Sequence, residues 1–204
     1  MTNAISLPLP VTEGGAPIWE TIRRRRSIRH YGEQPMPLET LSQLVWSTHG
    51  TSGRAGAREL RTAPSAGACY PIDIHVVANR VSGVDPGLYR YLPEDHALLV
   101  VRKGAVGQEV AEAALGQSMC AQASVTLVWT AVLPRTTNRY GERGRRYVFL
   151  DAGHVGQNVY LAATALDLGC CTIAAFDDFE MNRVLGVDGE IETTVYCASI
   201  GPLE

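Results

Sequence analysis

The chain has 204 residues, 46% of them hydrophobic, which is enough for one compact domain with a large core. Its formal net charge of -3 gives no overall attraction to nucleic acid or to an anionic membrane surface, so neither is expected as a partner. Five cysteines without C-x-x-C spacing are typical of reduced thiols in a cytoplasmic protein. All basic residues but Lys103 are Arg, which nearly excludes P-loop or Schiff-base lysine chemistry.

The first part of the chain predicts a tail followed by two helices. Residues 1–17 are rich in Pro, Gly, Ser and Thr, with neither a secretory signal nor a membrane span, and predict a flexible or draped tail before a domain over 18–204. Regular structure is expected to begin near Ile18, with a short helix to Arg26. After Pro37, apolar residues at three- and four-residue spacing predict an amphipathic helix, and 50–56 predicts a flexible loop.

The rest of the chain mixes strands with helices. Apolar and β-branched runs bounded by Gly and Pro predict five strands, at 72–77, 87–92, 98–102, 124–133 and 193–200. Helices are expected at 106–115 and at 147–168, where an apolar stripe indicates a buried helix that Gly169 ends, and a further short helix should precede the last strand. Without any repeat or regular strand-helix alternation, the fold class is α+β.

Residues 23–31 form the sharpest local motif, because six of the nine are Arg or His. Several guanidiniums and a Ser hydroxyl can bind a phosphate by charge-assisted hydrogen bonds. A solvated basic patch, with or without RNA contacts, is an equally open interpretation. The nearby helical register places these arginines on several faces, so not all of them are expected to meet one ligand.

Two further segments are candidates for a site. Residues 62–71 are small and closed by prolines, so a flat ligand can lie against their backbone, although a tight turn has the same composition. Residues 138–147 form a charged segment, predicted as a loop, in which Arg139 can favour a Tyr140 phenolate. On the helix that follows, His154, Gln157 and Asn158 beside Asp151 are expected to form a structural hydrogen-bonded layer.

Several chemical signatures are missing from the sequence. It contains no G-x-G-x-x-G after a strand, no G-x-S-x-G, no H-E-x-x-H and no Cys/His set with zinc spacing. We therefore expect neither a Rossmann NAD site nor a metal centre.

Together these motifs resemble the nitroreductase superfamily from about Ile18 to Gly201. The resemblance implies a nitroreductase-like fold, with a mixed central sheet packed by helices, and an interlocked homodimer with FMN at the interface. It implies FMN-phosphate contacts for Arg25, Arg26 and Ser27, and a contact of Arg29 with the pyrimidine edge of the ring. The segment containing Pro64, Ser65, Ala66 and Gly67 would line FMN from the partner subunit, and the backbone of Ile173, Ala174 and Ala175 would reach the reactive flavin nitrogen.

Within the superfamily, residues 139–147 followed by 150–158 resemble the SagB-type dehydrogenases, which oxidise azoline rings to azoles in peptide natural-product biosynthesis. That resemblance gives Tyr140 the role of catalytic base. The pair is Arg139-Tyr140 where relatives have Lys-Tyr, and an Arg keeps its charge but cannot give up a proton.

The alternatives are an NAD(P)H-dependent reductase of nitroaromatics or quinones, and a non-catalytic flavin-binding subunit of a biosynthetic complex. An RNA-binding module is disfavoured by the acidic net charge. The substrate is expected to be a small molecule, a peptide or a carrier-bound group, and biosynthetic partner proteins are compatible with any of these.

Overall fold

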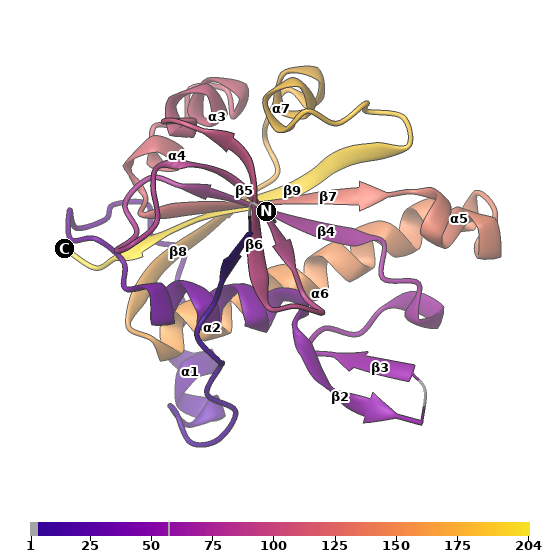
Figure 1. Ribbon diagram of the computed structural model, residues 1–204, viewed down its shortest axis with the longest axis horizontal. Coiled ribbons are helices and arrows are strands. Elements are labelled where there is room, and N and C mark those ends of the chain that lie inside the picture. Colours follow the sequence, from indigo (N-terminus) through magenta and orange to yellow (C-terminus); the bar gives the residue numbers. More distant parts are fainter. Residues whose placement is uncertain (1–3, 57) are drawn as a thin grey trace.

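A seven-stranded sheet forms the centre of the molecule, in the order β1-β6-β5-β4-β7-β9-β8 (Figure 1). The computed structural model describes residues 4–56 and 58–204. A separate hairpin pairs β2 with β3. The strands are β1 (Ala4–Ser6), β2 (Thr51–Ala55), β3 (Arg58–Arg61), β4 (Ile72–Ala78), β5 (Gly87–Leu92), β6 (Ala97–Lys103), β7 (Val125–Val132), β8 (Leu168–Ile173) and β9 (Glu192–Pro202).

Helices cover both faces of this sheet (Figure 1). The long helix α6 and helix α2 pack on one face, and α3, α4 and α7 pack on the other. None of the helices in the described part of the chain has the length and hydropathy to cross a membrane. The helices are α1 (Ile18–Arg24), α2 (Leu38–His49), α3 (Gly107–Ala113), α4 (Met119–Gln122), α5 (Pro134–Tyr140), α6 (Arg143–Ala165) and α7 (Asp178–Leu185), with one 3-10 turn, η1 (Ala66–Ala68).

The core lies on both sides of the central strands. Strands β4 and β7 pair in register from Ile72↔Ala131 to Ala78↔Val125, and nearly all of their residues are buried. Because helices cover both of their faces, these strands are buried on both sides rather than on alternate residues. The apolar stripe of α6, including Val148, Val155 and Val159, is buried as the periodicity predicts.

The α+β fold class is confirmed, but the expectation of a mixed sheet is wrong in one respect. Every strand pair in the seven-stranded sheet is antiparallel. Strands β7 and β8, which are joined through α5 and α6, run in the same direction, but β9 lies between them and is antiparallel to both. A parallel crossover is therefore present without a parallel pair.

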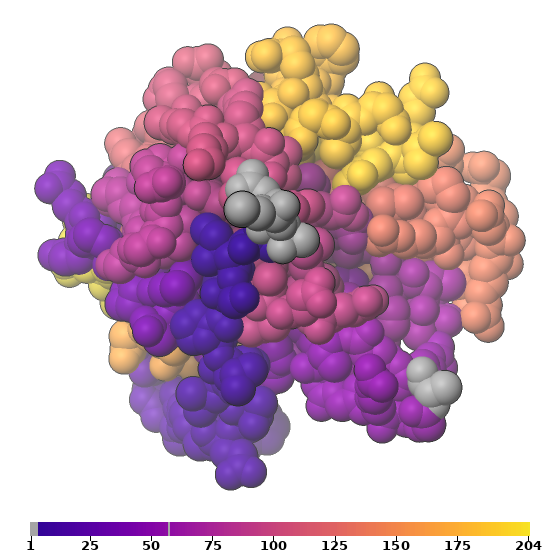
Figure 2. Space-filling model, viewed as in Figure 1, coloured from indigo at the N-terminus to yellow at the C-terminus, as the bar shows by residue number. Residues whose placement is uncertain are grey.

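The beginning of the chain is more ordered than the sequence predicts. Strand β1 pairs with β6, Leu7 is buried, and the Val11 N–H donates to Gln43 at 2.8 Å. Figure 2 shows this segment, in indigo, lying across the surface of the molecule. The expectation that regular structure begins near Ile18 is therefore wrong, because a three-residue edge strand has too little periodicity to be recognised.

Three other segments differ from the prediction. The predicted loop at 50–56 contains β2, and the predicted loop at 138–147 is the end of α5 and the first turn of α6. Helix α6 ends at Ala165, and the turn that follows is made by Asp167, whose φ is +54°. Gly169, predicted to end the helix, lies instead in β8, where a Cβ atom would meet the Ile28 side chain at 2.9 Å.

Candidate functional site

The predicted phosphate-binding segment leaves α1 in an extended conformation and is held against α6. The Ser27 hydroxyl lies 2.8 Å from the Tyr160 hydroxyl, and the Arg25 guanidinium lies over the Tyr160 ring, 5.1 Å from its centroid. The Ile28 N–H donates to the carbonyl of Cys170 in β8 at 2.9 Å. One buried tyrosine therefore sets the positions of both Arg25 and Ser27.

The same tyrosine links this segment to the end of β8. The Tyr160 hydroxyl accepts the Thr172 N–H at 3.0 Å, and the Thr172 hydroxyl accepts from Tyr196 at 2.7 Å. Ile173, which follows directly, is buried, and Ala174 and Ala175 are exposed beyond the strand end. Through Tyr160, the structure thus joins Ser27 to Thr172, the residue that directly precedes the predicted segment 173–175.

The charge at this position suits a phosphate. Among the described residues, no carboxylate forms an ion pair with Arg25, Arg26 or Arg29. The Arg26 side chain turns back to donate to the carbonyls of Arg23 and Arg25, at 3.0 and 2.7 Å. The uncompensated positive charge and the Ser27 hydroxyl fit the anionic end of FMN.

The small-residue segment is held at another point on α6, by Asp151. The Ser65 hydroxyl donates to the Asp151 carboxylate at 2.6 Å, and the Ala66 N–H donates to it at 3.2 Å. The Ser65 oxygen in turn accepts the Tyr70 N–H at 2.9 Å. Burial raises the pKa of Asp151, and the bonds from Ser65 and Ala66 oppose that rise.

The backbone that follows Ser65 is strained. Gly67, Ala68 and Tyr70 have φ values of +59°, +49° and +47°, a region that a bulky residue such as tyrosine rarely adopts. Together with Arg58, Leu60 and Arg61, this segment lines a cavity of about 420 Å³. Backbone strain of this kind clusters at ligand-binding sites, and the small side chains leave the backbone accessible to a flat ring.

The predicted catalytic pair lies against this segment. The Arg139 guanidinium donates to the Gly67 carbonyl at 3.2 Å, and Arg58 donates to the same oxygen at 3.2 Å. Arg139 lies over the Tyr140 ring, 5.4 Å from its centroid. A Cβ atom added at Gly67 would overlap the Tyr140 hydroxyl. The structure therefore juxtaposes the Tyr140 hydroxyl, a guanidinium and the proposed ring-binding backbone.

Within one chain, the two groups of predicted residues are attached to different parts of α6. Tyr160 follows Asp151 by nine residues, which separates them by about 14 Å along the helix. Between these two points, the Asn158 side chain donates to the carbonyls of Ser47 in α2 and of Thr62, at the start of the small-residue segment, at 3.0 and 3.2 Å. The expectation that Asp151 and Asn158 bond within one layer on the helix is wrong, because both reach outward to other segments.

Sequence reasoning did not identify Tyr160 and Thr172 as parts of the site, and it assigned Asp151 to a structural layer. The sequence signal for these roles was weak: Asp151 and Tyr160 carry polar groups on a helix whose apolar stripe predicts burial, and both are buried in α6. Among the described residues, no three His, Cys, Asp or Glu side chains are grouped so that they could hold a metal ion.

Comparison with known proteins places this arrangement in a family. The profile described as the nitroreductase family matches residues 22–201. The chain belongs to the nitroreductase family. A candidate nitroreductase of Methanocaldococcus jannaschii is 40% identical over 187 residues, which are 92% of each chain. The crystal structure of a candidate nitroreductase from Ralstonia eutropha has a TM-score of 0.85 at 27% identity, with 99% of this chain and 90% of that chain covered.

Weaker similarities reach biosynthetic proteins. The trifolitoxin-processing protein TfxB of Rhizobium leguminosarum bv. trifolii is 29% identical over 69% of this chain, which corresponds to 39% of that protein. The Escherichia coli microcin synthetase McbBCD complex, solved with truncated pro-MccB17 bound, contains a chain with a TM-score of 0.73 at 20% identity, with 97% of this chain and 77% of that chain covered. At that identity the likeness concerns the fold alone.

Proposed function

We propose that this chain is an FMN-dependent oxidoreductase of the SagB type, which oxidises azoline rings to azoles in peptide natural-product biosynthesis. The observation that carries the proposal is the contact between the Tyr140 hydroxyl and Gly67, with the Arg139 guanidinium over the Tyr140 ring. This contact supports the proposal, because the tyrosine hydroxyl lies beside a backbone that suits a flat cofactor. The similarity to a trifolitoxin-processing protein supports a role in the maturation of a peptide product.

In this proposal, FMN binds at the interface of a homodimer. Arg25, Arg26 and Ser27 hold the phosphate, Arg29 contacts the pyrimidine edge, and the backbone of 173–175 lies along the reactive side of the ring. The partner subunit contributes the segment 64–67. The separation of the two groups along α6 supports this division, because each group is rigidly held by its own α6 side chain, Tyr160 or Asp151.

Bound FMN supplies the hydride acceptor, and the protein supplies the position and the base. An azoline becomes an azole when one ring carbon loses a proton and the adjacent carbon loses a hydride, so that a carbon-carbon double bond forms. Tyr140 takes the proton, with the Arg139 guanidinium over its ring. Because Arg139 keeps its own protons, Tyr140 is the only base of the pair.

The experiment is turnover of a small thiazoline, 2-methylthiazoline-4-carboxylic acid N-methylamide, by the FMN-loaded protein in air, with the thiazole detected by mass spectrometry. We expect turnover by the wild type and a loss of about 100-fold or more in kcat for Tyr140→Phe, with FMN content unchanged. Tyr147→Phe is the matched control, because Tyr147 packs edge-on against Tyr140 with ring centroids 5.1 Å apart. Equal rates for wild type and Tyr140→Phe would remove Tyr140 from the mechanism.

The second candidate is a nicotinamide-dependent reductase of nitro or quinone compounds, which is favoured by the 40% identity to a candidate nitroreductase over 92% of both chains. It predicts rapid anaerobic bleaching of the flavin by NADPH or NADH. A stable flavin spectrum with either donor, together with thiazoline turnover, would reject it. Bound flavin without either reaction would instead indicate a non-catalytic subunit.

A further inference from the structure

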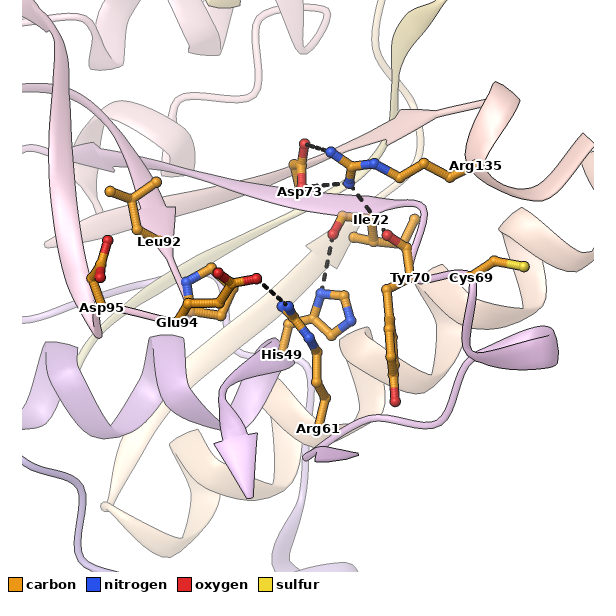
Figure 3. A pocket seen from close by; sticks show the side chains of 11 residues that line it. His49, Arg61, Cys69, Tyr70, Ile72, Asp73, Leu92, Glu94, Asp95 and Arg135 are labelled. Carbon is orange, nitrogen blue, oxygen red and sulfur yellow. Dashed lines mark hydrogen bonds and ion pairs between the residues drawn. The ribbon is translucent and has the colours of Figure 1, made fainter. Parts of the chain in front are cut away.

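A second cavity of about 420 Å³ lies next to the candidate site (Figure 3). Arg61 and Tyr70 line both this cavity and the one formed by the small-residue segment, so these two side chains are the wall between them. The Tyr70 ring packs against both the Arg61 guanidinium and the His49 ring, with 5.2 Å to each. We define the second cavity, lined by His49, Arg61, Asp73, Glu94, Asp95 and Arg135 among others, as the His49 cavity.

His49 offers this cavity a hydrogen-bond acceptor. Its side chain is buried at the end of α2, with Nδ1 3.1 Å from the Ile72 carbonyl oxygen. Since a carbonyl can only accept, Nδ1 carries the hydrogen, and in the neutral ring the lone pair is on Nε2. Burial, reinforced by the charge of Arg61, lowers the pKa of His49 to about 4, so the ring is neutral at physiological pH.

Arg61 offers donors. Its side chain is only 13% exposed, yet it donates no hydrogen bond to any acceptor in residues 4–56 and 58–204. The carboxylates of Glu59 and Glu94 are 3.6 Å from its terminal nitrogen, and its buried Nε has no partner. A largely buried guanidinium with unused N–H groups is costly unless a ligand or solvent supplies an acceptor. In Figure 3 the guanidinium lies beside the His49 ring and faces Glu94.

We propose that the His49 cavity binds an amide group of the substrate, with the amide carbonyl accepting from Arg61 and the amide N–H donating to His49 Nε2. This inference rests on the proposed function and assigns recognition of the amide that neighbours the reacting ring to His49 and Arg61. The reacting ring lies on the Tyr140 side of Tyr70, and the neighbouring amide lies on the His49 side.

The charges favour a neutral amide over a carboxylate. Three carboxylates line the cavity, from Asp73, Glu94 and Asp95, against two guanidiniums, from Arg61 and Arg135. Arg135 is already paired with Asp73, through two contacts of 2.8 and 3.1 Å. A carboxylate would also bring a lone pair against the lone pair of His49 Nε2, whereas an amide brings the N–H that this acceptor requires.

The test compares two probes with the same ring on the FMN-loaded protein: the N-methylamide named above and the free acid, 2-methylthiazoline-4-carboxylate. We expect the wild type to prefer the amide by about tenfold in kcat/KM, which corresponds to one well-formed hydrogen bond. His49→Asn keeps an N–H for the Ile72 carbonyl, but its shorter side chain has no acceptor at the position of Nε2. Arg61→Lys keeps the charge and removes the planar set of donors. Each should raise KM for the amide about tenfold more than it raises KM for the acid, and change kcat equally for the two probes.

Arg102→Lys is the matched control, because Arg102 pairs with Glu109 outside this cavity. If His49→Asn lowers the melting temperature or the FMN content, the two probes are compared on Arg61→Lys instead. Equal kcat/KM for the two probes in the wild type, or equal losses for both probes in the variants, overturns the inference. If neither probe is oxidised, the proposed function fails, and the inference is tested by titrating the flavin absorption with each probe. A change in the flavin spectrum with the amide alone supports the inference. A change with both probes, or with neither, overturns it.

Discussion

The Asp151 carboxylate accepts the Ser65 hydroxyl hydrogen at 2.6 Å, across 86 residues of sequence. The same carboxylate accepts the Ala66 N–H, so two donors of one segment converge on a single side chain of α6. The following residues, Gly67 to Tyr70, include three with left-handed φ values. Asp151 therefore holds the start of a strained segment, and this relationship can be tested without a substrate.

We expect Asp151→Asn to loosen this segment. An asparagine oxygen can satisfy one of the two donors, but its NH₂ group then faces the other, which leaves a buried donor unpaired at a cost of about 1–3 kcal/mol. The melting temperature and the FMN affinity should both fall. Differential scanning fluorimetry and FMN titration measure these effects, and Asp85→Asn, at an exposed carboxylate, is the control. An unchanged FMN affinity would show that the segment is not part of the flavin site.

Gly67→Ala tests the contact with Tyr140. The new Cβ atom would overlap the Tyr140 hydroxyl, and Gly67 has a φ of +59°, so the variant combines backbone strain with displacement of the tyrosine. Gly83→Ala is the matched control, because its φ is +77° but no atom lies within 4 Å of the added Cβ atom. Both variants should lose about 1 kcal/mol of stability from the left-handed backbone.

Thiazoline turnover should fall only in Gly67→Ala, and by at least as much as in Tyr140→Phe. Comparable turnover in Gly67→Ala and Gly83→Ala would mean that the position of the Tyr140 hydroxyl is unimportant. Because the control carries the same kind of backbone strain, a difference between the two variants cannot be attributed to φ alone.

Arg25→Gln tests the phosphate role of the N-terminal segment. If Arg25 contacts the phosphate, the variant should bind FMN about tenfold more weakly, consistent with the loss of one charge-assisted hydrogen bond. It should bind riboflavin, which has no phosphate, as tightly as the wild type does. Equilibrium titration with both flavins measures the difference, with Arg102→Gln as the control. Equal weakening for both flavins would indicate that Arg25 acts only through its packing on Tyr160.

The elements that the sequence predicts well are those with a strong local pattern. Strand β5 has the predicted bounds, and α6 shows the expected apolar stripe. Strand β8 was not predicted because it directly follows a helix whose periodicity continues to Leu166. The β2–β3 hairpin was not predicted because its residues are half-buried or exposed and include few β-branched side chains, so its pairing leaves no periodic signal.

Prediction of the candidate site from the sequence is limited in the same way, by the absence of a local pattern. Tyr140 and the small-residue segment can be singled out individually, but nothing local indicates that Gly67 and Tyr140 touch across 73 residues of sequence. His49 and Arg61 carry no motif, since their significance lies in unused hydrogen-bonding groups that only packing reveals. Long-range contacts and orphaned donors are properties of the fold, and sequence periodicity does not encode them.

The buried His49 should make stability depend on pH in a characteristic way. Its pKa is lowered to about 4 from an ordinary value of 6.5, first by burial and then by Arg61. Between these two values the folded state binds fewer protons than the unfolded state, so the free energy of unfolding rises with pH. The contribution is fully present above pH 6.5 and is lost as the pH falls towards 4, with a size of about 3 kcal/mol.

His49→Asn removes this titration, so the variant isolates it from the carboxylates that titrate in the same range. The difference in free energy of unfolding between wild type and His49→Asn should shrink by about 3 kcal/mol when the pH is lowered from 7 to 4. Urea unfolding at several pH values measures this difference. His154→Asn, at an exposed position on α6, is the control. A difference between wild type and His49→Asn that stays constant with pH would mean that His49 charges as readily in the folded protein as in the unfolded chain, which contradicts the lowering of its pKa by burial and by Arg61.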